Sequence, residues 1–174
     1  MLRARLLTSL VFNLAVAAWV LVDAGARGAR KPGFASILAL LWGPLGLGFW
    51  ESDRPLALGE TRVGGTATAI ARGFLRGWIA MLPAIAVLAF AAIQHRAAVP
   101  GSLGRQIGLL PATAVALSMA WGAPAVLAVV LGAVAKTSSI ERGTSAAAAG
   151  PLSPSMAAAL AGALALVCAL GLTL

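Results

Sequence analysis

The sequence is poor in charged and reactive side chains. Only 10% of its 174 residues carry charge, and it contains five acidic residues, one histidine and no tyrosine. A soluble domain has roughly 25% charged residues, so this chain has too few of them to cover a water-facing surface. The composition excludes an ordinary cytosolic enzyme and a disordered protein.

Groups that bind metals or cofactors are equally scarce. Cys168 is the single cysteine, which excludes an intramolecular disulfide. The sequence has no GxSxG or HExxH motif and no paired cysteines or histidines, so we predict no catalytic residue, no metal and no cofactor. His95, the only histidine, is a candidate single ligand for a pigment or metal, and a solvated interfacial histidine is the simpler interpretation.

Apolar runs dominate what is present, since 60% of the residues are hydrophobic. Five segments stand out, at residues 6–22, 34–50, 74–93, 107–134 and 156–174. A bilayer core about 30 Å thick requires roughly 20 helical residues, and helices satisfy their own backbone groups. We therefore predict an all-α integral membrane protein, one domain over residues 1–174 with a compact bundle of about five transmembrane helices.

Two features of this bundle have alternatives. The short connection at residues 23–33 predicts that the first two helices form an antiparallel hairpin. The first segment also resembles a signal peptide with Ala24-Gly25-Ala26 as its cleavage site, but its apolar run exceeds the usual 7–15 residues, which favours an uncleaved helix. The last segment either spans the bilayer or lies at its interface, which would give four spans plus an interfacial helix.

Basic residues outnumber acidic ones by 13 to 5, giving a net charge of +8. They are scattered between apolar runs, which indicates contacts with lipid head groups and topology signals rather than nucleic-acid binding. The abundance of arginine and alanine hints at a GC-rich bacterial genome. With the N-terminus in the cytoplasm of a bacterial cell, five spans place eight basic residues inside and five outside. The inner set is Arg3, Arg5, Arg54, Arg62, Arg72, Arg76, Lys136 and Arg142, and the outer set is Arg27, Arg30, Lys31, Arg96 and Arg105.

Small residues at helical spacing predict close helix contacts. Such contacts either dock a partner or pack this bundle internally, and internal packing is the simpler interpretation in an alanine-rich chain. The candidates are Asn13, for an interhelical hydrogen bond, and Gly43, Gly46, Gly48, Gly73, Gly77, Ala158 and Gly162. Prolines inside apolar segments (Pro44, Pro83, Pro111 and Pro124) predict kinks. The glycine-rich stretch 41–50 is predicted to form only a weak helix, in which the chain can break.

The longest polar loop, residues 51–73, collects acids, bases and hydroxyls. It is not a P-loop, because no Gly-Lys-Ser/Thr follows its glycines. The candidates for contact with lipid phosphates or small anions are Arg62, Gly64, Gly65, Thr66, Arg72 and Arg76. A solvated connector with local ion pairs is the simpler interpretation.

The sequence favours a non-enzymatic multi-pass membrane protein over an enzyme. We expect an accessory or scaffold subunit of a larger bacterial membrane complex, or a small homo-oligomer, whose partners are lipids and membrane proteins. The intramembrane prolines support a small-solute transporter or channel as the alternative, and a cavity lined by Asn13, Thr113 or Ser118 would favour it. A second alternative is a lipid-modifying enzyme that uses the loop at residues 51–66.

Overall fold

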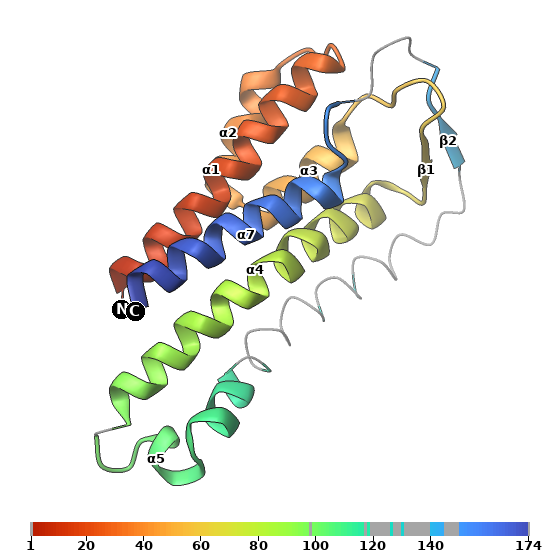
Figure 1. The fold of residues 1–174 in the computed structure, drawn as a ribbon. Coiled ribbons are helices and arrows are strands. Elements are labelled where there is room, and N and C mark those ends of the chain that lie inside the picture. The colour runs from red at the N-terminus through yellow and green to blue at the C-terminus, as the bar shows by residue number, and fades with distance from the viewer. Residues whose placement is uncertain are drawn as a thin grey trace.

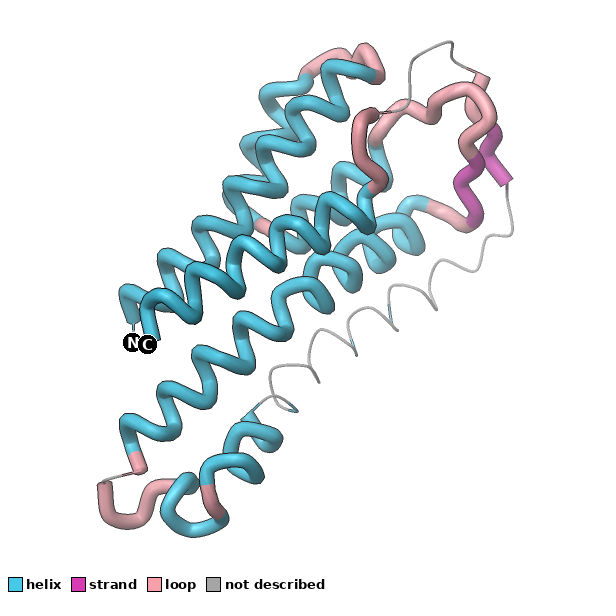
Figure 2. The backbone as a smooth tube through the Cα atoms, in the orientation of Figure 1, coloured by secondary structure: helices cyan, strands magenta, loops and turns pink. Residues whose placement is uncertain are grey.

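The computed structural model describes residues 2–97, 99–116, 118, 126, 130, 140–144 and 150–173. These form a long helical bundle with a small two-stranded ribbon at one end (Figures 1 and 2). The elements in chain order are α1 (Leu2–Ala26), α2 (Pro32–Trp42), α3 (Pro44–Asp53), β1 (Thr61–Val63), α4 (Thr66–Arg96), α5 (Leu103–Ile107), β2 (Ile140–Arg142) and α7 (Pro154–Thr173).

In the described part of the chain, three helices, α1, α4 and α7, are long and apolar enough to cross a membrane. They contain 25, 31 and 20 residues, which corresponds to lengths of roughly 30 Å or more. The α7 helix packs against both α1 and α4, and the two chain termini lie at the same end of the bundle (Figure 1). We call the other end, which carries the loops at 27–31 and 54–65 and the strand pair, the polar end.

The predicted helix at 34–50 is instead two short helices that meet at Gly43. Pro44 has no N–H to donate to the carbonyl of residue 40, and Gly43 adopts φ 49° and ψ −114°. The α2 helix runs antiparallel to α1, since Ser36 Oγ donates to Ala17 O and Asn13 Nδ2 donates to Leu40 O. The antiparallel pairing predicted for the first two helices is therefore confirmed, although the second helix ends midway.

After Gly43 the chain turns back toward the polar end. Gly77 of α4 lies against Pro44, and Gly73, one turn nearer the start of α4, lies against Gly48. The α3 helix is thus antiparallel to α4 and ends at the same end where α2 began. Helices α2 and α3 form an antiparallel hairpin, and the segment at 34–50 does not traverse the bundle as predicted.

The described structure is mostly helical, which is consistent with the predicted all-α class, and it adds one short strand pair that was not predicted. Strands β1 and β2 are antiparallel, with Arg62 opposite Glu141. The ribbon joins two chain segments about 80 residues apart, and it brings the chain back to the polar end after α4 has left it. In the fourth predicted segment, residues 109–116 are helical, and most of the remainder, including Pro124, lies outside the described residues.

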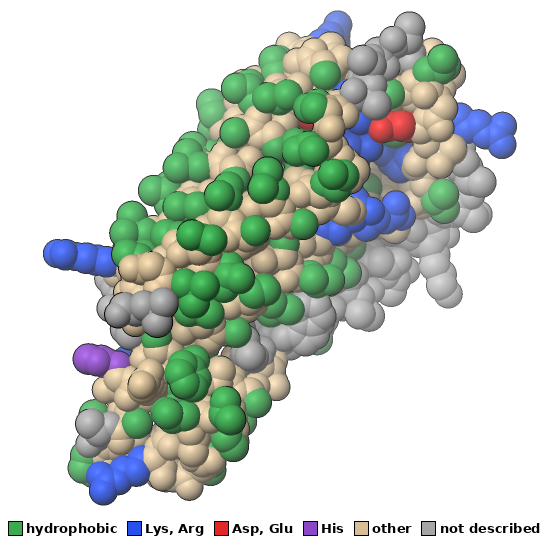
Figure 3. Space-filling view, viewed as in Figure 1, with side chains coloured by type: hydrophobic (Ala, Val, Ile, Leu, Met, Phe, Trp, Pro, Cys, Tyr) green, Lys and Arg blue, Asp and Glu red, His purple; other side chains and the backbone are tan. Residues whose placement is uncertain are grey.

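The core is one cluster of buried side chains from α1, α2, α3, α4 and α7. Phe12, Val16 and Val20 of α1 and Leu47 of α3 are at most 1% exposed. On α7 the buried positions are small, such as Ala161 and Ala165, so the helices approach closely. Large apolar side chains point outward instead along the helices, where Figure 3 shows them in green.

Candidate functional site

A buried network of charges connects the elements of the polar end. Asp23, in the last turn of α1, is completely buried and accepts hydrogen bonds from Arg27 Nε at 2.8 Å and Trp50 Nε1 at 2.9 Å. Gly150, just before α7, lies against the same carboxylate. Asp23 therefore ties α1, α3 and the approach to α7 together.

Arg27 extends this network into the 54–65 loop. Its guanidinium donates to both carboxylate oxygens of Glu60, at 2.6 and 2.8 Å, and to Pro55 O at 2.8 Å. The hydrogen bond from Arg27 holds the pKa of Glu60 at about 2, and the carboxylates around Arg27 raise its own pKa further. Both groups are charged at neutral pH, and the pair fixes the loop to the end of α1.

Two more arginines close the loop. Arg54 lies 3.4 Å from Glu60 and 3.9 Å from Asp23, and burial lowers its pKa. Arg62 donates to the backbone oxygens of Ser52 and Arg54 and lies 3.4 Å from Glu141 of β2. These arginines serve as crosslinks between backbone segments.

A separate ion pair joins α3 to α4. Arg76 Nη1 donates to Glu51 Oε2 at 2.6 Å, and Glu51 is only 7% exposed. Gly73, one turn before Arg76, leaves the space that the Glu51 side chain occupies. Among the described residues, Glu51 Oε1 has no hydrogen-bond partner, so the carboxylate is held from one side.

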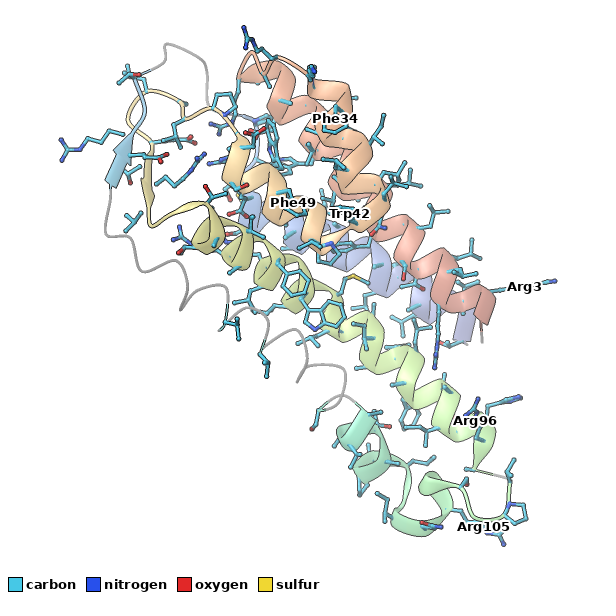
Figure 4. All side chains as sticks on the ribbon, turned by 180° about the vertical axis from the view of Figure 1, so that it is seen from behind. Arg3, Phe34, Trp42, Phe49, Arg96 and Arg105 are labelled. Carbon is cyan, nitrogen blue, oxygen red and sulfur yellow. The ribbon has the colours of Figure 1, made fainter. Side chains whose placement is uncertain are left out.

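A groove of about 960 Å³ lies between α2 and α3. Phe34, Leu38 and Trp42 follow one another at four-residue spacing on α2, and Phe49 faces them from α3, with its ring centroid 5.4 Å from that of Trp42. Phe34 and Trp42 are 61% and 51% exposed. Figure 4 shows these rings on the open side of the hairpin.

The mouth of this groove is polar and lies at the polar end. It is formed by the loop that includes Arg30 and Lys31 and by Ser52, Asp53 and Pro55. Arg30, Lys31 and Asp53 are exposed, and within the described part of the chain none of the three forms an ion pair. The groove therefore combines an apolar wall with free charges at its opening.

The residues predicted to contact lipid or anions have other partners. Arg62 and Arg76 form the contacts given above, and Arg72 donates to Val63 O at 3.1 Å. Gly64, with φ 91°, and Gly65 lead into α4, which begins at Thr66. The α4 helix therefore begins eight residues before the predicted segment at 74–93, inside the predicted polar loop, and its neighbouring arginines bind protein groups.

The predicted packing residues lie at contacts within this chain. Asn13 forms the interhelical hydrogen bond expected of it, and Gly43 lies against its side chain. The other contacts pair Gly46 with Ala39, Gly48 with Gly73, Gly77 with Pro44 and Gly162 with Ala80, and Ala158 is buried. These small residues are occupied inside the bundle, as the simpler interpretation of them holds.

The remaining sequence candidates lie apart from both features. His95 is exposed in the last turn of α4, and the described residues include no cluster of three or more potential metal ligands. The groove was not predicted from the sequence, although the four-residue spacing of Phe34, Leu38 and Trp42 is a visible signal. Comparison with protein-family models, curated proteins and solved structures finds no match to this chain.

Proposed function

We propose that the chain is a non-enzymatic multi-pass membrane protein that acts as an accessory or scaffold subunit of a larger bacterial membrane complex, or as a small homo-oligomer. The observation that carries this proposal is the pairing of its charges. Asp23, Glu51, Glu60 and Glu141 each lie within 4 Å of an arginine. Groups bound to one another in this way stabilise a scaffold and are not free to act on a substrate.

The outward faces of the helices support the same proposal. Large apolar side chains such as Leu14, Ile79, Leu160 and Val167 are 49–68% exposed. Such a surface suits lipid or other membrane proteins. Because the small residues are used inside the bundle, these outer faces are the proposed contact surfaces.

The distribution of basic residues favours a cytoplasmic polar end. Six basic residues (Arg27, Arg30, Lys31, Arg54, Arg62 and Arg142) lie in the loops and strands of that end, and four (Arg3, Arg5, Arg96 and Arg105) lie toward the other. By the positive-inside rule, the N-terminus then lies outside the cytoplasm. This reverses the orientation expected from five spans, because the hairpin puts residues 27 and 54 at one end.

Cysteine labelling tests this topology. In a Cys168→Ser background, single substitutions Arg30→Cys, Leu58→Cys and Val99→Cys are treated with a membrane-impermeant thiol reagent in intact and opened cells. We expect residues 30 and 58 to react from the cytoplasmic side and residue 99 from the opposite side. Labelling of residues 30 and 58 from opposite sides would contradict the re-entrant hairpin.

The test of the subunit role is the mass of the intact particle. The chain, extracted from its native membrane in mild detergent, should form a particle with a fixed stoichiometry that exceeds the 17.4 kDa monomer. A second polypeptide or further copies of the chain should account for the added mass. A lone monomer that binds detergent only would refute the proposal.

Solute permeation is the second candidate, and the break at Gly43 favours it. Interrupted helices at membrane depth occur where backbone is buried in protein or lines a cavity. However, Thr113 and Ser118 hydrogen-bond to their own helix, and Asn13 to α2, and none of the three lines the groove. Solute-driven swelling of vesicles that contain the purified chain would favour permeation over the subunit role.

A further inference from the structure

We propose that the groove between α2 and α3 binds one acyl chain of an anionic phospholipid, with the lipid phosphate held at Arg30 and Lys31. The inference rests on the membrane placement proposed above, and it does not depend on the subunit role. It assigns a ligand to a surface that the charge network leaves open.

The depth of the groove matches one leaflet of a bilayer. The 11 residues of α2 rise about 16 Å, which is about half of a 30 Å hydrocarbon core. The groove starts at the polar end and stops where the two helices meet at Gly43. An acyl chain enters from the head-group region and ends near the midplane, as this groove does, whereas a transmembrane partner helix would have to continue past the hairpin tip.

The walls of the groove are apolar over this depth. Phe34, Leu38, Trp42 and Phe49 line it. At Gly46 the two helices are so close that a side chain there would collide with the backbone of Ala39. Its volume of about 960 Å³ lies within the range of about 300–1,000 Å³ seen for small-molecule sites. Half-exposed aromatic rings here lose contact with water or mobile lipid when a chain is bound.

The charges at the mouth favour an anionic head group. Arg30 and Lys31 carry two positive charges without partners among the described residues, and Asp53 carries one negative charge. The first turn of α2 contains no acid and has no side-chain cap, so the positive end of its dipole adds to the same field. The net charge at the mouth is close to one positive unit.

The lipid preference can be measured through Trp42. The full chain is reconstituted in phosphatidylcholine vesicles that contain a minor share of one brominated lipid. That lipid is either brominated phosphatidylglycerol or brominated phosphatidylcholine, and its acyl chains quench tryptophan fluorescence on contact. The contribution of Trp42 is the difference in tryptophan fluorescence between the parent and Trp42→Phe. One net basic charge near an anionic head group corresponds to about a fivefold preference, so we expect brominated phosphatidylglycerol to quench Trp42 with about fivefold higher apparent affinity.

Charge variants give the test its direction. Arg30→Gln/Lys31→Gln leaves one net negative charge at the mouth and should reverse the preference to about fivefold in favour of phosphatidylcholine. Asp53→Asn leaves two net positive charges and should increase the preference for phosphatidylglycerol by about a further fivefold. The matched control is Arg96→Gln/Arg105→Gln, which removes two exposed arginines at the opposite end of the bundle (Figure 4) and should retain it.

Three outcomes would overturn the inference. Equal quenching by the two lipids would remove the anionic preference, and equal losses in the control and the mouth variants would show a general effect of charge. Shielding of Trp42 from both lipids would mean that protein, a second copy or a partner, occupies the groove. Failure of the chain to float with vesicles would refute the membrane proposal, which is a distinct result.

Discussion

Replacement of Arg27 by methionine should be among the most destabilising single substitutions at the polar end. The Arg27 side chain is 3% exposed, and its loss removes charge-assisted hydrogen bonds to Asp23 and Glu60 and one to Pro55 O. Asp23 would keep Trp50 Nε1 at 2.9 Å, but its remaining cation would be Arg54, which lies 3.9 Å away and forms no hydrogen bond with it. Removal of one partner from a buried ion pair costs about 3–5 kcal/mol, and we expect that loss in the free energy of unfolding.

A double-variant cycle separates this explanation from a general loss of packing. Asp23→Leu/Arg27→Met removes both charges. It leaves Trp50 Nε1 buried without a partner, at a cost of about 1–3 kcal/mol. It also takes the Arg27 donor from Pro55 O and from Glu60, which are partly exposed and can be hydrated. The double variant should therefore be more stable than Arg27→Met alone. Reversible unfolding in mild detergent, followed by circular dichroism, measures both. Two results would refute this explanation. One is that the losses in free energy of unfolding of Asp23→Leu and Arg27→Met simply add in the double variant. The other is that the loss for Arg27→Met differs from that of the exposed control Arg30→Met by less than about 0.5 kcal/mol.

Three further predictions concern single residues. Gly73→Ala places Cβ 2.6 Å from a backbone atom of α3 and should destabilise the fold by about 1–3 kcal/mol. In the control Gly25→Ala, the new Cβ meets nothing within 4 Å and should stabilise the fold by about 0.4–1 kcal/mol. Melting temperatures in detergent test these opposite signs. Because its pKa is about 2 when folded and about 4.3 when unfolded, Glu60 stabilises the fold above about pH 4.3, and that contribution is lost as pH falls toward 2. Glu60→Gln should flatten melting temperature against pH in this window, and an unchanged slope would contradict the assignment. Asn13→Leu leaves Leu40 O without its donor and should cost about 1–3 kcal/mol, and chemical unfolding that matches the parent would contradict that role.

The sequence predicted the long helices well because their signal is local. Apolar runs at 6–22, 74–93 and 156–174 correspond to α1, α4 and α7. Helices α1 and α4 extend several residues beyond their runs, and α7 begins two residues before its run. The hydrogen bond of Asn13 was also predictable, because an amide inside an apolar helix needs a partner in order to be buried. The helix signals depend on residues within a few turns of one another, whereas the partner of Asn13 lies 27 residues away.

The hairpin could not be predicted from hydropathy. One apolar run of 17 residues has the same mean hydropathy whether it forms one helix or two antiparallel half-helices. The weak stretch around Gly43 marked the position of a break but not the direction of the chain after it. That direction depends on α4, where Gly73 and Gly77 leave room for α3, and these glycines lie some 30 residues further along the sequence.

The charge network was hidden for a related reason. The i,i+4 pair of Asp23 and Arg27 is visible in the sequence, but Arg27 and Glu60 are 33 residues apart. Five alternating spans assign Arg27 and Arg54 to opposite sides of the membrane, whereas in the structure both contact Glu60. An error in one element thus changed the expected environment of every charge near it.

The hairpin and the network explain each other. Two half-helices that return to one end leave free termini there, and the contacts of Trp50 with Asp23 and of Glu51 with Arg76 fix the returning half. At the tip, Asn13 supplies the N–H that Pro44 cannot donate to Leu40 O. The hairpin is therefore held at its base and at its tip by the inner helices, while its outer face stays open. A ligand in the outer groove would meet a surface whose shape is already fixed, and its binding would not require the bundle to rearrange.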